Sequence, residues 1–171
     1  GVLQGLDAVI AGEVNHAFAL VRPPGHHATS EEAMGFCLFN NIAIAAEYAK
    51  RKYKLERILI ADFDVHHGTG TQETFYADSK VLYFSSHQYP WYPGTGSIYE
   101  DGAGDGKGFT VNAPLPAYCG DKEHLRVYKE ILIPVAKRFQ PQLMLVSAGY
   151  DPHWADQLSL MQLTCSGFAA I

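Results

Sequence analysis

Apolar and polar positions alternate along this chain in blocks typical of strands and helices that follow one another. Short apolar runs, which predict strands, occupy residues 18–21, 58–61, 81–87, 109–115 and 143–146. Apolar residues with helical spacing predict helices over 3–14, 42–53, 71–76 and 121–139, and a further helix is expected within 154–171. Strands that alternate with helices favour an α/β fold with a largely parallel sheet and flanking helices.

Capping and breaking residues predict where the helices begin and end. Asn40 is expected to cap the helix over 42–53, and Asp121 to cap the helix that starts there. Pro134 should kink that last long helix, and Pro141 should prevent its continuation. No linker, repeat or low-complexity tract interrupts the chain, so we expect residues 1–171 to form a single domain.

Polar residues enter in strict alternation directly after the apolar run at 58–61. Asp62, Asp64 and His66 are separated by Phe63 and Val65. Side chains two apart on a strand share a face, so we expect two carboxylates and an imidazole to line one side of the strand's carboxyl end. For any one of these residues a solvated strand end would be explanation enough. The whole run, in register after a core strand, favours a metal site.

Other predicted strands also end in polar groups. A proline-rich turn after 18–21 carries His26 and His27, and the strand at 81–87 ends with Ser85 and His87. The strand at 143–146 is followed by Asp151. Ligands of open α/β sheets bind at the carboxyl ends of the strands, so we expect these groups to surround one site.

Carboxylate and imidazole are the donors that suit a divalent ion such as zinc, and ferrous iron tolerates the same ligands. Catalytic zinc usually has three protein ligands and one open position. Asp64, His66 and Asp151 would make such a set, with Asp62 orienting a neighbouring histidine.

Composition excludes some classes of binding partner. The formal net charge of -5 argues against nucleic acid, and no apolar run is long enough to span a membrane. No secretory signal is visible, and the first residue is Gly1 rather than Met. The cysteines, Cys37, Cys119 and Cys165, are far apart, so we expect small buried thiols in a reducing cytoplasm.

Five motifs, in order along the chain, resemble those of the zinc-dependent histone deacetylase family, including its bacterial amidohydrolase members. They are R-P-P-G-H-H-A (22–28), G-F-C-L-F-N (35–40), D-F-D-V-H-H-G-T-G (62–70), Y-P-G-T-G (92–96) and S-A-G-Y-D (147–151). The resemblance implies an arginase/deacetylase-like fold. It also implies a hydrolase that uses metal-activated water to remove acetyl or acyl groups from lysine peptides or small amines.

The same resemblance implies roles for individual residues. Asp64, His66 and Asp151 match the zinc ligands, His27 the proton shuttle, and Asp62 the partner of His26. Two larger groups are also implied. The substrate channel would use Gly35, Phe36 and Tyr92, with Trp91 as a further candidate wall, and a potassium site would use Asp62, Asp64, His66, Ser85 and Ser86.

Two departures from the family pattern stand out. Position 69 is Thr, where many relatives have Asp or Asn contacting the second histidine, so His27 should be less basic. The glycine-rich segment that carries the family's catalytic Tyr lies downstream of the S-A-G-Y-D motif and is absent. We therefore expect an incomplete domain and weak activity of these 171 residues alone. A family strand that inserts between strands present here should also be missing, leaving exposed edges through which copies associate.

Three alternative functions remain open. Two-manganese ureohydrolases of related fold carry an extra carboxylate where this chain has Gly68, and an acidic ligand near His153. A catalytically impaired module that binds acetyl ligands is a second alternative. Acetylpolyamine deacetylases are a third; their channel-mouth Glu matches Leu158 here, which favours acetyl-lysine or simple amides instead.

Overall fold

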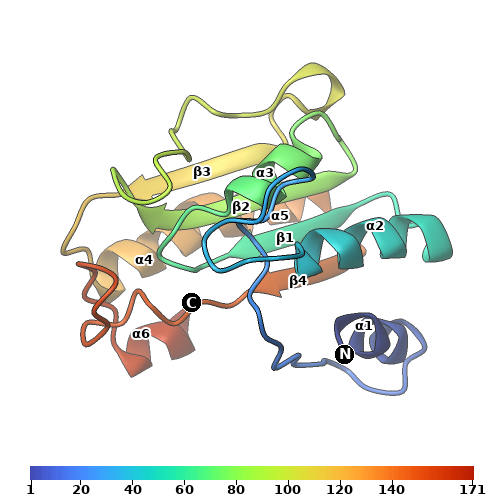
Figure 1. The fold of residues 1–171 in the computed structure, drawn as a ribbon, viewed down its shortest axis with the longest axis horizontal. Helices are drawn as coiled ribbons and strands as arrows, with labels where there is room; N and C mark the ends of the chain where they lie inside the picture. The colour runs from blue at the N-terminus through green and yellow to red at the C-terminus, as the bar shows by residue number, and fades with distance from the viewer.

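The structure, a computed structural model, describes residues 1–171 and contains one sheet of four parallel strands (Figure 1). The strands are β1 (Ile58–Asp62), β2 (Val81–Gln88), β3 (Thr110–Leu115) and β4 (Leu143–Ser147), in the spatial order β3-β2-β1-β4. Every neighbouring pair is parallel, so all four carboxyl ends meet at one edge of the sheet. The predicted α/β class and parallel sheet are confirmed.

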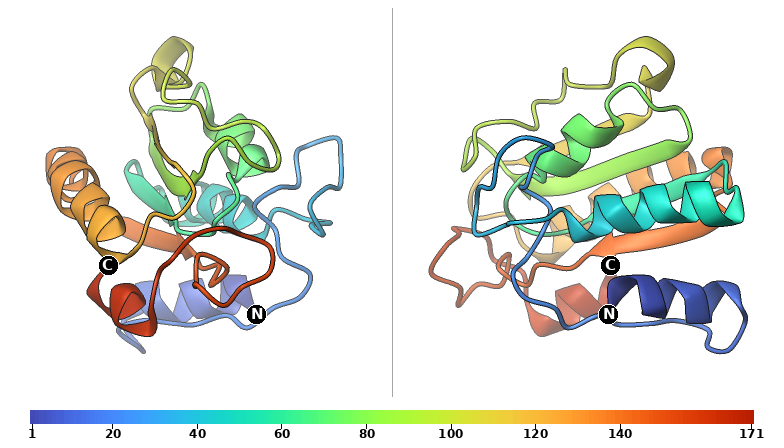
Figure 2. Two further views of the ribbon diagram at one scale, coloured as in Figure 1. Left: turned by 90° about the vertical axis from the view of Figure 1, so that its left-hand side faces the viewer. Right: turned by 45° about the vertical axis from the view of Figure 1, so that its right-hand side comes forward.

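Helices cover both faces of the sheet, as the two views in Figure 2 show. They are α1 (Val2–Ile10), α2 (Asn41–Tyr53), α3 (Thr69–Phe75), α4 (Asp121–Val127), α5 (Ile133–Phe139) and α6 (Cys165–Ala170). Alternate residues of β1 enter different cores, as the pleat requires. Ile58 and Ile60 pack with α2, whereas Leu59 and Ala61 pack towards the segment between α4 and α5.

One of the two predicted helix caps is confirmed and the other is wrong. The Asn40 side chain accepts the N–H of Ala43 at 3.1 Å and caps α2 as expected. Asp121 does not cap α4, because the cap position is Gly120 and Asp121 is the first helical residue. Its carboxylate instead accepts the backbone N–H and the hydroxyl of Thr164, at 2.8 and 2.7 Å, and so joins the starts of α4 and α6.

Pro134 interrupts the helix between residues 121 and 139, as predicted. A π-helical turn, Tyr128–Leu132, separates α4 from α5. Proline has no N–H to donate to the preceding turn, and a wider turn accommodates the missing bond. Gln140, with a left-handed backbone, ends α5, and Pro141 follows it.

The apolar run at 18–21 is not a strand, so that prediction was wrong. No sheet neighbour pairs with it, and Phe18 and Leu20 are 67% and 88% exposed. Four apolar residues carry too little periodicity to distinguish a strand from an unpaired extended segment. The first helix also ends at Ile10, earlier than predicted, which leaves Val14 exposed.

The strands pair without a gap, which contradicts the expectation that a missing strand inserts between them. β1 is bonded to β2 on one side and to β4 on the other over its whole length. Unsatisfied apolar surface is found instead on β4, an edge strand, where Met144 and Val146 are 52% and 46% exposed. These two side chains align with Leu59 and Ala61, but no helix covers them as α5 covers the inner strands.

All three cysteines are free thiols, and two are buried as predicted. Cys165 is the exception, because it begins α6 at the surface. Its Sγ lies 3.8 Å from His153 Nε2.

Candidate functional site

Asp64, His66 and Asp151 come together beyond the carboxyl ends of β1 and β4. One ligand atom from each lies within 4.8 Å of the others. His66 Nδ1 is 3.1 Å from Asp64 Oδ1 and 2.9 Å from Asp151 Oδ2. The cluster exists because β1 and β4 pair in parallel, which carries the two following loops to the same edge of the sheet.

The polar run after β1 is a loop and not the strand extension that the alternation predicted. β1 ends at Asp62, whose Oδ1 accepts the N–H of Asp64 at 3.2 Å. Asp64 Oδ1 in turn accepts the N–H of His66 at 2.8 Å. Such bonds from a side chain to the backbone two residues on compete with strand pairing and bend the chain. The three groups nevertheless converge.

The second loop of the site is held against the first. Asp151 Oδ1 accepts the N–H of Val65 at 2.9 Å, which leaves Oδ2 directed at His66. Gly149 allows this close approach, because a Cβ at that position would overlap the Asp64 carboxylate. The S-A-G-Y-D motif thereby positions the Asp151 carboxylate and leaves room for that of Asp64.

Asp62 and His26 form a buried ion pair next to this cluster. His26 Nδ1 lies 2.9 Å from Asp62 Oδ2, and the Tyr83 hydroxyl donates to the same oxygen at 3.2 Å. Burial lowers the pKa of His26, but the charge and hydrogen bond of Asp62, with smaller contributions from Asp64 and Asp151, raise it overall to about 9. His26 is therefore a cation at neutral pH in the metal-free protein.

His27 has the opposite electrostatic character. Its ring centroid lies 4.1 Å from that of His26, 6.1 Å from His66 and 5.2 Å from Tyr92. Burial, followed by the positive charges of His26 and His66, lowers its pKa to about 3. His27 is therefore neutral at pH 7 in the metal-free protein, and one of its ring nitrogens is free to accept a proton.

Thr69 is not hydrogen-bonded to His27, contrary to the expectation from the family pattern. Its hydroxyl bonds that of Thr95 at 2.5 Å, and His27 Nδ1 is buried without a hydrogen-bond partner. His27 is indeed less basic than an ordinary histidine, but burial and neighbouring cations are the cause.

Two of the predicted channel residues, Gly35 and Tyr92, lie against His27. Gly35 has φ +55°, and a Cβ there would overlap the His27 ring. Phe36, also at positive φ, is 85% exposed, and Tyr92 meets His27 edge to face. Trp91 and Leu158 lie together at the surface, since Trp91 Nε1 donates to the Leu158 carbonyl at 3.0 Å.

Ser85 and Ser86, both predicted cation ligands, direct their hydroxyls to different partners. Ser85 Oγ bonds His87 Nδ1 at 2.9 Å, whereas Ser86 Oγ bonds the Tyr128 hydroxyl at 3.2 Å. Adjacent strand residues point to opposite faces, so the two hydroxyls cannot share one ion. A common ion would need main-chain carbonyls, which Ser85 could offer from its position opposite Asp62.

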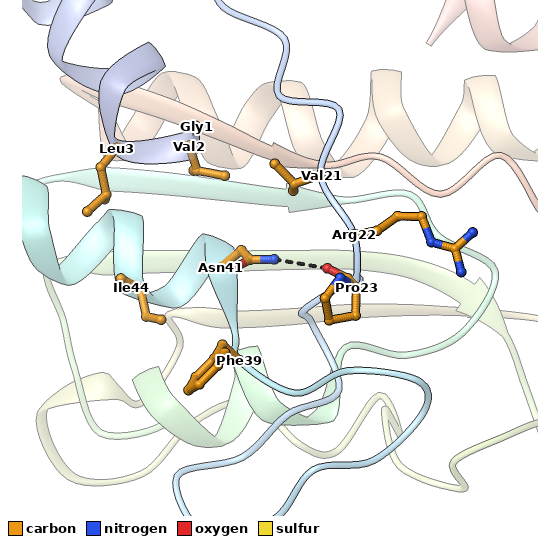
Figure 3. Close-up of a pocket in the computed structure, with 9 residues that line it drawn as sticks. All are labelled: Gly1, Val2, Leu3, Val21, Arg22, Pro23, Phe39, Asn41 and Ile44. Carbon is orange, nitrogen blue, oxygen red and sulfur yellow. Dashed lines mark hydrogen bonds between the residues drawn. The ribbon is translucent and has the colours of Figure 1, made fainter.

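A cavity of about 430 Å³ lies away from this cluster, between α1, the 21–23 segment and α2 (Figure 3). Apolar side chains dominate its lining, and Asn41 Nδ2 donates to the Pro23 carbonyl at 3.2 Å. Arg22 is its one charged residue, so the cavity offers no acid, base or metal ligand set. The polar cluster, and not this cavity, is therefore the candidate site.

The buried histidines predict a stability maximum in the metal-free protein. The folded protein lowers the pKa of His27 and His67 to about 3 and that of His87 to about 4. Below pH 6.5 the unfolded chain therefore binds more protons at these residues than the folded protein does, so the free energy of unfolding falls as the pH is lowered. The pKa of His26 and of His66 is raised to about 9 in the folded protein. Their contribution to the free energy of unfolding is therefore complete below pH 6.5 and is lost as the pH rises through 9. Urea unfolding with a chelator should show greatest stability near pH 6.5. A steady rise in stability from pH 5 to 9 would contradict these assignments.

Comparisons with known proteins identify the family of this chain. The sequence model described as "Histone deacetylase domain" matches residues 1–171. The chain is 52% identical over 151 residues to "Histone deacetylase 10, chloroplastic" of Oryza sativa subsp. japonica, covering 88% of this chain and 34% of that protein. It is 47% identical over 169 residues to a "Probable deacetylase" of Archaeoglobus fulgidus, covering 99% and 47%.

A solved structure has the same fold as this chain. The HDA15 HD domain superimposes with a TM-score of 0.95 at 41% identity, over 98% of this chain and 50% of that one. The chain thus spans half or less of the length of each protein described. No helix in it has the length and apolar character needed to cross a bilayer.

Proposed function

This chain belongs to the histone deacetylase family, and we propose that it acts as a zinc-dependent amidohydrolase that removes acetyl or related acyl groups from lysine side chains or similar amines. The observation that carries the proposal is the convergence of Asp64, His66 and Asp151 beside the neutral imidazole of His27. A ligand set and a proton acceptor at one edge of the sheet are what metal-assisted amide hydrolysis requires.

The donor set fits a divalent zinc ion. Two carboxylates and an imidazole are suitable zinc ligands, and three protein ligands leave a position open. When bound, zinc would lower the pKa of a coordinated water and polarise the acyl carbonyl. Ferrous iron suits the same donors, so the choice of metal is itself part of the proposal.

The histidines supply the proton transfers in this proposal. A ring nitrogen of His27 accepts the proton of the attacking water and then donates it to the leaving amine. His26 keeps its proton at Nδ1, directed at Asp62 Oδ2, so His27 is the imidazole left free to accept a proton. The fixed geometry of both rings provides the proximity on which such catalysis depends.

Leu158 favours acetyl-lysine peptides over acetylated polyamines as substrates. Its exposed apolar side chain, next to Trp91, offers no partner to a second ammonium group. Replacing Leu158 with Glu should raise kcat/KM for acetylspermidine relative to an acetyl-lysine peptide by up to about fivefold, since an exposed pair contributes up to about 1 kcal/mol.

Leu158→Gln is the matched control for that experiment, because it has the same length without the charge. Both substrates should respond to it alike. A wild-type enzyme that already prefers acetylspermidine would rule out the proposed substrate class.

Neither non-deacetylase alternative has a specific observation in its favour. A two-metal ureohydrolase would need a second ligand cluster, and one group of three metal-binding side chains is found. A module that only binds acetyl ligands would have no use for the buried ion pair of His26 and Asp62.

Two further assignments are proposals. Potassium would bind near Asp62 through main-chain carbonyls, since the hydroxyls of Ser85 and Ser86 diverge. A cytoplasmic location is favoured by three free thiols, which suit a reducing compartment.

A further inference from the structure

Glu100 lies outside every motif of the active site, yet its carboxylate is fully engaged. It accepts the Gln72 amide at 2.6 Å and the backbone N–H groups of Gly96 and Ser97 at 3.1 and 3.0 Å. Partial burial raises the pKa of Glu100, but these three hydrogen bonds lower it overall, so the side chain is an anion at neutral pH. Bonds to an ionised acceptor are the stronger kind.

The charge of Glu100 fixes the direction of a buried hydrogen-bond chain. A carboxylate only accepts, so Gln72 must direct its NH2 towards Glu100 and its oxygen inwards. That oxygen faces Asn112 Nδ2 at 2.7 Å and His67 Nε2 at 3.1 Å. Both must therefore donate, which places the proton of neutral His67 on Nε2.

The chain continues from His67 to the Y-P-G-T-G motif. His67 Nδ1 lies 2.7 Å from Thr95 Oγ1 and, lacking a proton, must accept from it. Thr95 must in turn accept from Thr69, 2.5 Å away. The order of donors thus explains why the Thr69 hydroxyl is not available to His27.

The loop itself is clamped at Gly96. Its N–H is held by Glu100, and its carbonyl accepts from His87 Nε2 at 2.9 Å. Gly96 has φ +91°, and a Cβ there would overlap the rings of His87 and His67. The segment from Thr95 to Ser97 is therefore bonded at each of three consecutive residues.

We propose that Glu100 is a positioning residue of the substrate channel, which holds the Trp91–Ser97 loop so that Tyr92 stays against His27. The other end of that loop, at Trp91, is held less firmly, by one hydrogen bond from the Trp91 indole N–H to the Leu158 carbonyl. Tyr92, half exposed between the two anchors, meets the rings of both His27 and His66. The effect on catalysis rests on the proposed deacetylase function, but the effect on the loop does not.

Glu100→Gln in the protein expressed from its complete gene tests the proposal. The variant keeps the shape of the side chain, but its NH2 group faces either Ser97 N–H or both Gly96 N–H and the Gln72 NH2, so donor meets donor. KM for an acetyl-lysine peptide should rise on the order of tenfold, because the bonds lost are charge-assisted. Bound zinc should be unchanged, and kcat should change by less than about threefold, because neither the ligands nor His27 are touched.

Glu123→Gln is the matched control, since Glu123 also accepts one backbone N–H, that of Gly120, but at the start of α4. It should leave KM unaltered. Equal KM for wild type and Glu100→Gln, or a fall in kcat alone, would overturn the proposal.

Amide exchange and nitrogen-15 NMR test the loop without any assay of activity. Protection of the Gly96 and Ser97 amides should fall more than about tenfold in Glu100→Gln but not in Glu123→Gln. In the wild type, the ring-nitrogen shifts of His67 should report the Nε2–H tautomer. An Nδ1–H tautomer, or unchanged amide protection, would contradict the positioning role even if deacetylation were confirmed. If the wild type showed this tautomer and this loss of amide protection in Glu100→Gln but had no deacetylase activity, the proposed function would be refuted and the positioning role would stand.

Discussion

Replacement of Asp64 by Ala is expected to abolish zinc binding and deacetylation together. Asp64 supplies one of three clustered donors, and its Oδ1 also accepts the N–H of His66, so the change removes a ligand and frees the loop carrying a second one. Loss of an outer-shell partner typically lowers metal affinity about 10–100-fold, and loss of a direct ligand should exceed that. We expect kcat/KM to fall by roughly 10³-fold or more.

Elemental analysis after dialysis and a peptide deacetylation assay provide the measurements. Asp105→Ala is a suitable control, because Asp105 is an exposed carboxylate on the Gly104–Gly106 turn, far from the cluster in sequence. It should retain zinc and activity. Full zinc occupancy in Asp64→Ala would show that the metal ligands are other residues.

Replacement of His27 by Ala is expected to give a zinc-loaded but nearly inactive protein. His27 is neutral and adjoins the ligand cluster, yet is not part of it. Removing a general acid–base group typically costs about 10²–10⁴-fold in rate. We expect a loss of that size in kcat at unchanged zinc content, with KM less affected.

The exposed His16 provides the control for that experiment, and His16→Ala should behave as wild type. The pH–rate profile adds a second test, since the limb due to the base should disappear in His27→Ala. If His27→Ala retained most of the wild-type kcat, the proton shuttle would have to be sought elsewhere, with His26 the next candidate.

Much of the fold was predictable from the sequence because long-range pairing and local pattern agree. The run at 58–61 is apolar on both faces, and β1 is buried throughout between β2 and β4. The run at 18–21 is equally apolar but has no neighbouring strand, so its state depends on pairing that a local pattern does not contain. The same limit applies to β4, whose position at the edge leaves Met144 and Val146 exposed.

The convergence of Asp64, His66 and Asp151 was predictable from the sequence, but the way in which the chain builds the cluster was not. The alternation of polar residues predicted that Asp62, Asp64 and His66 lie together at the carboxyl end of β1. They do so in a loop, in which backbone N–H groups donate to the carboxylates of Asp62 and Asp64. The role of Glu100 could not be predicted, because nothing in the neighbouring sequence shows that its carboxylate oxygens face Gly96 and Gln72. The partner of Thr69 could not be predicted either, since the direction of its hydrogen-bond chain is set by Glu100, at the opposite end.

Anomalous diffraction at the zinc absorption edge, on crystals of the zinc-loaded protein, tests the central claim most directly. One peak per chain is expected, at about 2.0–2.2 Å from a nitrogen of His66 and from carboxylate oxygens of Asp64 and Asp151. Two peaks about 3.5–4 Å apart would indicate a two-metal hydrolase. A peak away from these three side chains, or none, would contradict the account.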